Sequence, residues 1–253
     1  MRESTATLGS VRRFSTHVLG ASACTAGAVL VAGENPWHVP LLGVLIVLAA
    51  PLGPIVRELL DAERGVPAPS DLQQMADDLA RRMSISPVPV GVTVDQPGVA
   101  ALRGVTRRTR RIVIGEPELS LPTARLLAIL AHEFAHAKAH HQEKGLLLSV
   151  LTWVAPQAAC GVTVPLLGGG SVAVVVASVV AGALTGVCEL ALYALMRRQE
   201  HEADRVASEL AGVWVSEQLA AHFCDHGEQR SHGSVYSTHP APAERAARLS
   251  GNN

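Results

Sequence analysis

Two histidines four residues apart, with a glutamate directly after the first, form the stretch His132-Glu133-Phe134-Ala135-His136. On an α-helix, residues four apart lie on one face, so His132 and His136 can direct two imidazole nitrogens at one point about 2 Å from each. Glu133 can then reach a water bound to the same metal ion. A zinc ion lowers the pKa of such a water toward neutrality, and the glutamate takes its proton for attack on a peptide carbonyl. The motif predicts a hydrolytic zinc site, and a pair of histidines without a metal is the alternative.

A catalytic zinc ion needs a third protein ligand and an open fourth position. His140 lies one turn beyond the motif along the helix axis, which places it poorly to share the ion. Better candidates are Glu200 and Asp204, four residues apart in a second predicted helix. One of them could bind zinc while the other accepts the N–H of a ligand histidine. Their neighbours His201 and Glu202 are expected to point elsewhere on that helix, as solvated residues.

The elements that must position these side chains follow from the apolar periodicity. The helix with the first motif is predicted to begin with Pro122 as its first residue and to continue to about His141. A second helix is predicted over Asp71–Met83, with Ser70 as its N-cap. Two short strands are predicted, Val88–Val94 and Arg111–Ile114. The five arginines from Arg103 to Arg111 are expected either to form a solvated hairpin tip or to hold anionic lipid or an acidic substrate.

The composition, with 48% hydrophobic and only 17% charged residues, is unusual for a purely soluble protein and suggests contact with a bilayer as well as a buried core. Four apolar segments stand out: Val18–Ala32, Val39–Val56, Gly145–Leu167 and Ser171–Met196. The last two are each long enough to cross about 30 Å of hydrocarbon, and only Glu189 is charged. We expect two membrane hairpins and four transmembrane helices. The alternatives are a signal peptide for the first segment and a buried pair of soluble helices for the last two.

Positive charge sets the expected topology. All 21 Lys and Arg residues fall in three polar regions: Met1–His17, Arg57–Lys144 and Arg197–Asn253. By the positive-inside rule these regions face the cytoplasm, so an even number of crossings of the plasma membrane is required. The expected organisation is a tail and hairpin over residues 1–57, a first catalytic part over 58–144, a second hairpin over 145–196 and a second catalytic part over 197–253. Glu189 is expected either to face the interior of the helix bundle near the active site, or to snorkel toward the nearby membrane surface or be protonated.

Other features exclude some functions. A net charge of −1 and the absence of a basic face with interleaved aromatics argue against nucleic-acid binding. The four cysteines are scattered without a C-x-x-C pair, which indicates small buried apolar residues and neither disulfides nor a thiolate metal site. The sequence indicates no oligomeric state.

Three separated signatures resemble those of the HtpX-like membrane zinc endopeptidases, relatives of the CaaX prenyl proteases. The signatures are Ala131-His132-Glu133-Phe134-Ala135-His136, then Glu200-His201-Glu202-Ala203-Asp204, then Thr238-His239-Pro240 with Arg245. The resemblance implies a predominantly α integral membrane protein with four transmembrane helices and a cytoplasmic, gluzincin-like α+β metalloprotease domain containing a small β-sheet. The chain departs from the family at Val99-Ala100-Ala101-Leu102, where Asn-Ala-Phe-Ala often precedes the edge strand.

The same resemblance assigns roles to residues. It implies His132, His136 and Glu200 as the ligands of one Zn²⁺ ion and Glu133 as the general base. Asp204 would hydrogen-bond a ligand histidine, His239 would donate a hydrogen bond to the oxyanion, and Arg245 would position the surroundings.

The expected function is a membrane-bound zinc endopeptidase that hydrolyses membrane proteins or peptides delivered at the bilayer. An extended substrate is expected to add beside the strand Ile112–Ile114 by backbone hydrogen bonding. The alternatives are a signalling metalloprotease of the antibiotic-sensor type and a non-catalytic zinc-containing membrane scaffold.

Overall fold

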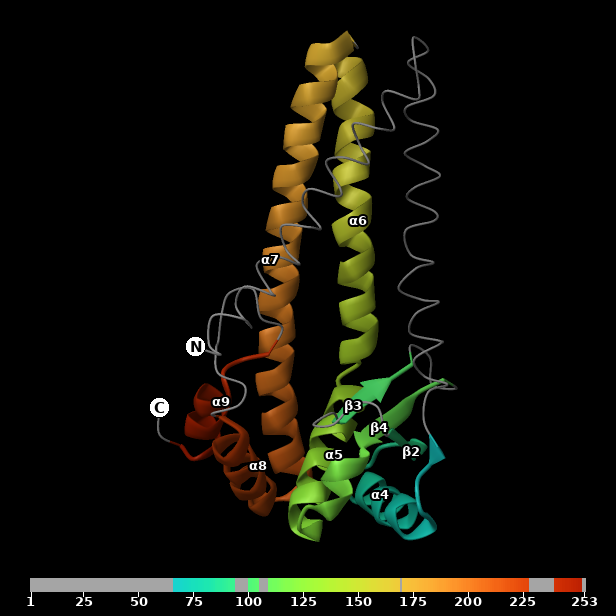
Figure 1. Cartoon of the computed structure of the whole chain (residues 1–253), viewed down its shortest axis with the longest axis vertical. Coiled ribbons are helices and arrows are strands. Elements are labelled where there is room, and N and C mark those ends of the chain that lie inside the picture. Colours follow the sequence, from blue (N-terminus) through green and yellow to red (C-terminus); the bar gives the residue numbers. More distant parts are fainter. Residues whose placement is uncertain (1–65, 94–99, 105–108, 169, 228–238, 252–253) are drawn as a thin grey trace. The chain divides into compact units, whose positions relative to one another are not determined.

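The computed structural model describes residues 66–93, 100–104, 109–168, 170–227 and 239–251 (Figure 1). The chain divides into two compact units. The described part of the first unit is Gly145–Leu195, and the second unit comprises Ile55–Lys144, Met196–Gly233 and His239–Asn253. The two predicted segments of the first membrane hairpin, Val18–Ala32 and Val39–Val56, lie outside the described residues.

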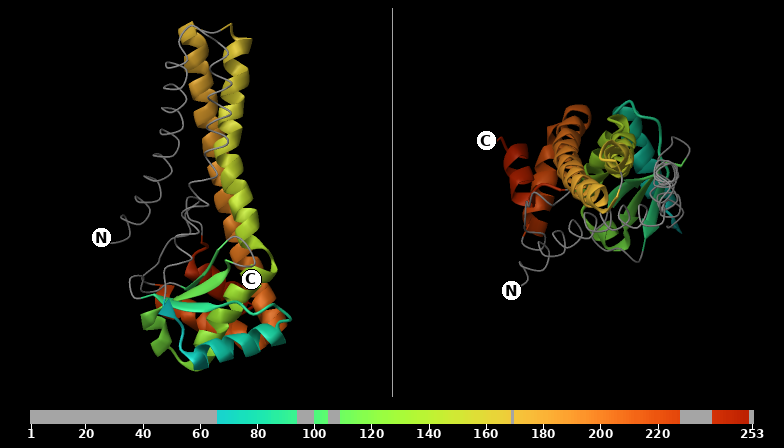
Figure 2. Two further views of the ribbon diagram at one scale, coloured as in Figure 1. Left: turned by 90° about the vertical axis from the view of Figure 1, so that its right-hand side faces the viewer. Right: turned by 90° about the horizontal axis from the view of Figure 1, so that it is seen from above.

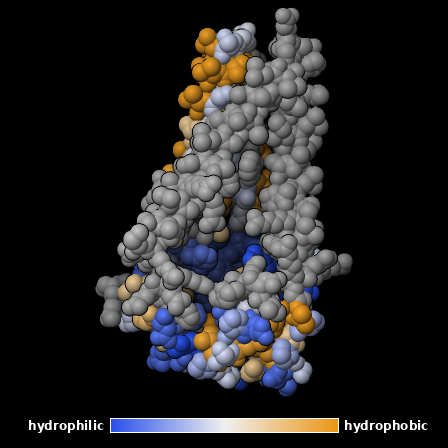
Figure 3. All heavy atoms as spheres, in the orientation of Figure 1, coloured by the Kyte–Doolittle hydropathy of each residue, from blue (hydrophilic) through white to orange (hydrophobic). Residues whose placement is uncertain are grey.

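The first unit is a hairpin made by the apolar parts of two long helices, α6 (His141–Leu166) and α7 (Gly170–Ala211), which run side by side (Figure 2). Both helices are long and apolar enough to cross a membrane, and only 25% and 28% of their apolar windows is buried. In the core of a soluble protein such helices would be mostly buried. Large apolar side chains near the tip of the hairpin are exposed, for example Leu166 and Val172, and this surface is orange in Figure 3. The third and fourth predicted apolar segments are therefore confirmed as helices.

Small residues bring the two helices of the hairpin together. Ala173, Ala177 and Ala181 of α7 are buried against Cys160 and Val164 of α6. The Cys160 thiol donates a hydrogen bond to the carbonyl oxygen of Ala177 at 3.2 Å. Small side chains permit this close approach of two helix backbones. Cys160 is buried as predicted, but another of the four cysteines, Cys224, is exposed at the end of α8 and does not fit the predicted burial.

The second unit contains a four-stranded mixed sheet. Its strands are β1 (Val66–Pro67), β2 (Val90–Thr93), β3 (Ala100–Arg103) and β4 (Arg111–Gly115). The strand order is β1-β2-β4-β3, with β4 parallel to β2 and antiparallel to β3. The prediction that substrate adds beside Ile112–Ile114 is wrong, because β4 has a neighbour on each side. In the described sheet, β3 is the edge strand nearest the motif helix.

Helices pack against this sheet and against one another to form the core, with α8 on α5 and α9 on α8. They are α4 (Ser70–Arg82), the 3₁₀ helix η1 (Glu116–Ser120), α5 (Thr123–Lys138), α8 (Val213–Gly227) and α9 (Pro242–Leu249). Fully buried Leu130 and Phe134 of α5 contribute to one cluster with Ile112 and Ile114 of β4. Burial of such side chains is the main stabilising term of the unit.

Two helix starts differ by one residue from their prediction. Pro69, and not Ser70, occupies the N-cap position of α4, and no side chain caps that helix. Pro122 is likewise the cap of α5 and not its first residue. In both cases the extended backbone that proline favours sets the start of the helix, so a side-chain cap is not required.

The motif helix α5 ends three residues earlier than predicted, at Lys138. His140 adopts a left-handed backbone with φ of +57°, after which α6 begins at His141. Arg110 holds this break, because its guanidinium donates to the Ala137 carbonyl at 3.3 Å and contacts His140 and Glu143. Arg110 is only 8% exposed, so this arginine does not belong to a solvated hairpin tip.

Candidate metal centre

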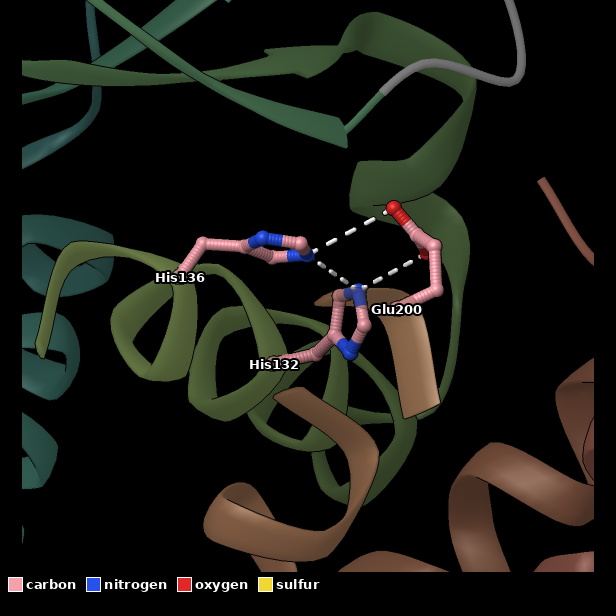
Figure 4. Close-up of side chains that lie close together, drawn as sticks. All are labelled: His132, His136 and Glu200. Atoms are coloured by element: carbon pink, nitrogen blue, oxygen red, sulfur yellow. Dashed lines mark hydrogen bonds and ion pairs between the residues drawn. The ribbon is translucent and has the colours of Figure 1, made fainter. Parts of the chain in front are cut away.

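Three predicted ligands converge in the second unit (Figure 4). The Nε2 atoms of His132 and His136 are 3.0 Å apart. The two carboxylate oxygens of Glu200 lie 3.5 Å from His132 Nε2 and 3.6 Å from His136 Nε2. Ligand atoms about 2.0–2.1 Å from a tetrahedral zinc ion are about 3.3 Å from one another, so two imidazoles and a carboxylate at this spacing fit that ion.

Two helices bring these ligands together. His132 and His136 lie one turn apart on α5, and Glu200 lies on α7 beyond its apolar part. Ala203 and Ala207 of α7 are fully buried in the same core as α5. Their small side chains leave room for α7 to approach the motif helix, so that Glu200 reaches the histidine pair.

A buried ion-pair network supports the ligands. Asp204 Oδ1 lies 2.9 Å from His132 Nδ1, which leaves His132 Nε2 for the metal. Arg245 donates to Asp204 through Nη2 at 2.6 Å and through Nε at 2.9 Å, and its Nη1 lies 2.9 Å from Glu200 Oε2. The guanidinium also stacks on the ring of Phe223, 4.0 Å from its centroid. Of the two acids left open by spacing, Glu200 faces the metal position and Asp204 the far side of His132.

The charges of the metal-free site follow from this network. Burial alone would lower the pKa of His132, but the hydrogen bond and charge of Asp204, with Glu200, raise it to about 10. Burial and the His132 charge lower the pKa of His136 to about 3. Burial by itself would raise the pKa of Glu200. The contacts and charges of His132, His239 and Arg245 outweigh burial and hold this pKa well below its usual range. The pKa of Asp204 is also lowered despite burial, and the charge of Arg245 is the main cause. A metal ion must therefore displace a proton from His132.

Glu133 lies beside the ligands but is not one of them. Its Oε2 accepts a hydrogen bond of 2.7 Å from the backbone N–H of Leu102 in β3. The side chain is buried, and this burial raises the pKa of Glu133. A buried carboxylate with a raised pKa next to a metal position is suited to accept a proton from water near neutral pH.

The remaining predicted residues also reach the site. His239 Nδ1 lies 3.2 Å from Glu200 Oε1, and the His239 side chain is 65% exposed, so it stands at the solvent side of the ligands. Arg245, from α9, is inside the network described above. His201 points away from the ligands and contacts Glu244 at 3.2 Å.

Two residues near the ligands were missed by sequence reasoning. The Nδ1 atoms of His141 and His136 are 2.9 Å apart, and His141 Nε2 lies 3.3 Å from Glu202 Oε2. The Glu202 side chain is 44% exposed, as expected of a solvated residue, but it also contacts His141, which was not predicted. On one continuous helix His141 would lie about 140° around the axis from His136, so its spacing carried no signal. The break at His140 is what turns it back toward the ligand.

Comparison with known proteins places this geometry in a family. No curated protein sequence matches the chain. Among solved structures, Ste24p of S. mikatae matches with a TM-score of 0.57 and 17% identity over 96% of this chain, which shows a shared fold. The chain spans 65% of the length of that protein. The sequence model of peptidase family M48 matches residues 68–253, a stretch that contains all three signatures. The chain therefore belongs to peptidase family M48, a family of zinc metallopeptidases, as its signatures predicted.

Proposed function

We propose that this chain is a membrane-bound zinc endopeptidase. The observation that carries the proposal is the convergence of His132, His136 and Glu200 on one point, with the Glu133 carboxylate close enough for the charges of His132 and Glu200 to act on its pKa. When bound, zinc supplies a Lewis acid that polarises a peptide carbonyl and acidifies a water. His132, His136 and Glu200 would hold the ion and leave its fourth position open.

The residues around the ligands then have distinct tasks. Glu133 takes the proton of the attacking water and afterwards delivers it to the leaving amine. Asp204 fixes the His132 ring through Nδ1, and Arg245 holds the Asp204 and Glu200 carboxylates. His239, at the solvent side of Glu200, would donate a hydrogen bond to the developing oxyanion.

The proposed substrate site runs along β3. Leu102 directs both backbone groups away from β4, since its N–H donates to Glu133 and its carbonyl accepts from the Gln142 side chain. An extended peptide adds to an edge strand by pairing with such outward backbone groups. A peptide aligned on Leu102 would pass directly beside the general base. Because Glu133 holds the Leu102 N–H, the peptide would pair there through the Leu102 carbonyl, which Gln142 occupies.

Gln142→Ala should therefore lower KM for a peptide substrate, because the Leu102 carbonyl becomes available without displacement of a side chain. One hydrogen bond contributes about 0.5–1.5 kcal/mol net, which corresponds to a decrease of about 2- to 10-fold. Steady-state kinetics on a quenched fluorescent peptide measure the effect. Lys144→Ala, an exposed change in the same turn of α6, serves as control. A KM that rises in Gln142→Ala would place the peptide elsewhere.

We further propose that the chain crosses the plasma membrane four times with its catalytic unit in the cytoplasm. The two exposed apolar helices and the confinement of Lys and Arg to the three polar regions support this topology.

In a Cys224→Ser background, a membrane-impermeant maleimide should label Ser171→Cys at the hairpin tip in intact cells and should label Ser70→Cys only after lysis. The reverse pattern would contradict the topology. Substrates would then be membrane proteins or peptides at the cytoplasmic surface.

Metal removal tests the activity itself. The purified protein in detergent should cleave an unfolded test protein, lose cleavage on treatment with a strong chelator, and regain it with one equivalent of zinc per chain. The loss of cleavage should be complete, because without the metal ion nothing polarises the carbonyl of the substrate's peptide bond. Metal analysis accompanies the assay. Zinc bound without turnover would instead indicate the non-catalytic scaffold.

A further inference from the structure

We propose that His141 and Glu202 form a hydrogen-bonded relay that positions His136 for metal binding. The inference rests on the proposed metal centre and adds two positioning residues to it. His141 is 3% exposed, and its Nδ1 lies 2.9 Å from His136 Nδ1. Glu202 Oε2 lies 3.3 Å from the other nitrogen of His141.

The direction of each hydrogen bond follows from the ligand role of His136. Its Nε2 faces His132 and Glu200, and a nitrogen that binds a metal carries no proton. The proton of neutral His136 is then on Nδ1 and is donated to His141 Nδ1. A neutral His141 that accepts there carries its own proton on Nε2 and donates it to the Glu202 carboxylate. With His136 bound to a metal through Nε2 and His141 neutral, these are the only positions for the two protons that satisfy both hydrogen bonds.

The fold places the relay through the helix break. His141 is the first residue of α6, and the left-handed backbone of His140 redirects the chain so that His141 returns to the ligand face. Arg110 secures that break through the Ala137 carbonyl. Glu202 comes from α7, two residues after the ligand Glu200, and its carboxylate reaches His141, the first residue of α6.

The two ligand histidines therefore have different support. His132 is backed directly by a buried carboxylate, Asp204, which is itself paired with Arg245. His136 is backed by an imidazole, and the carboxylate behind it is 44% exposed. Groups that fix a ligand histidine typically change metal affinity by about 10- to 100-fold when removed. The relay should accordingly be measurable as metal affinity, independent of turnover.

Zinc affinity of the metal-free full-length protein, measured by competition with a chromophoric chelator, tests the relay. His141→Phe keeps a ring but offers no acceptor, and should weaken zinc binding about 10- to 100-fold. His141→Asn places an amide oxygen near the Nδ1 position and should recover part of that loss. Glu202→Gln should weaken binding in the wild type and have no further effect in His141→Phe, because the relay is already broken.

Two references make the outcomes distinct. Lys144→Ala changes an exposed residue in the same turn of α6, outside the ligands and the relay, and should leave zinc affinity unchanged. His136→Ala removes a ligand and sets the scale of complete loss. Unchanged affinity in His141→Phe would overturn the relay alone, and a loss as large as in His136→Ala would make His141 a direct ligand. Unchanged affinity in His136→Ala would overturn the metal centre itself.

Discussion

Glu133→Gln should lower kcat by about 10²- to 10⁴-fold while zinc binding stays at one ion per chain. Glu133 is outside the ligand group, so the amide removes only the proton acceptor. The amide oxygen can still accept the hydrogen bond from the Leu102 N–H, which keeps β3 and α5 in register. Peptide-cleavage kinetics and metal analysis on the same preparation measure both quantities. The variant should therefore fold and bind zinc but turn over slowly.

A matched control is available in Glu118→Gln, which changes another buried glutamate, in η1, away from the ligands. Its kcat should equal that of the wild type. Glu133→Asp should retain part of the activity, since a carboxylate remains but lies farther from the water. Wild-type turnover by Glu133→Gln would assign the base to a different group. Loss of zinc in that variant would show that the amide disturbs the ligands.

The sequence predicted the parts of this structure that depend on local pattern. The lengths of Gly145–Leu167 and Ser171–Met196, in which Glu189 is the single charged residue, predict long helices because apolar residues on every side of a helix require burial or lipid. The four-residue spacing of His132 and His136 predicts a shared face, and the structure has it. The choice between Glu200 and Asp204 was not available from spacing, because it depends on where α7 meets α5.

The features that the sequence could not predict depend on tertiary contacts. Strand β3 begins with Ala100-Ala101, residues of low strand propensity, and it pairs because β4 lies beside it. The end of α5 has no glycine or proline to signal it, and Arg110 from another element holds the break. The role of His141 follows from that break alone. The proposed substrate edge, β3, likewise depends on the strand order, which the sequence does not reveal.

Arg245→Met should destabilise the metal-free protein by about 3–5 kcal/mol, the usual cost of removing one partner from a buried ion pair. The methionine keeps much of the contact with Phe223, but Asp204 and Glu200 lose one of the two cations that they share and keep only His132. Denaturant titration in mild detergent measures the free energy of unfolding. Arg248→Met, on the exposed side of the same helix, should change it by less than about 0.5 kcal/mol.

The size of this effect should depend on pH and on zinc in a defined direction. In the wild type, the lowered pKa values of Glu200 and Asp204 stabilise the fold above the unfolded carboxyl pKa, and this contribution is lost as pH falls through the lower folded values. In Arg245→Met this contribution is smaller. The difference in the free energy of unfolding between the wild type and Arg245→Met should therefore decrease as the pH is lowered. Zinc should also decrease this difference in the free energy of unfolding at neutral pH, because the bound cation partly replaces the lost positive charge beside Glu200. A difference that is independent of both would mean that Arg245 acts through packing, and not through the two carboxylates.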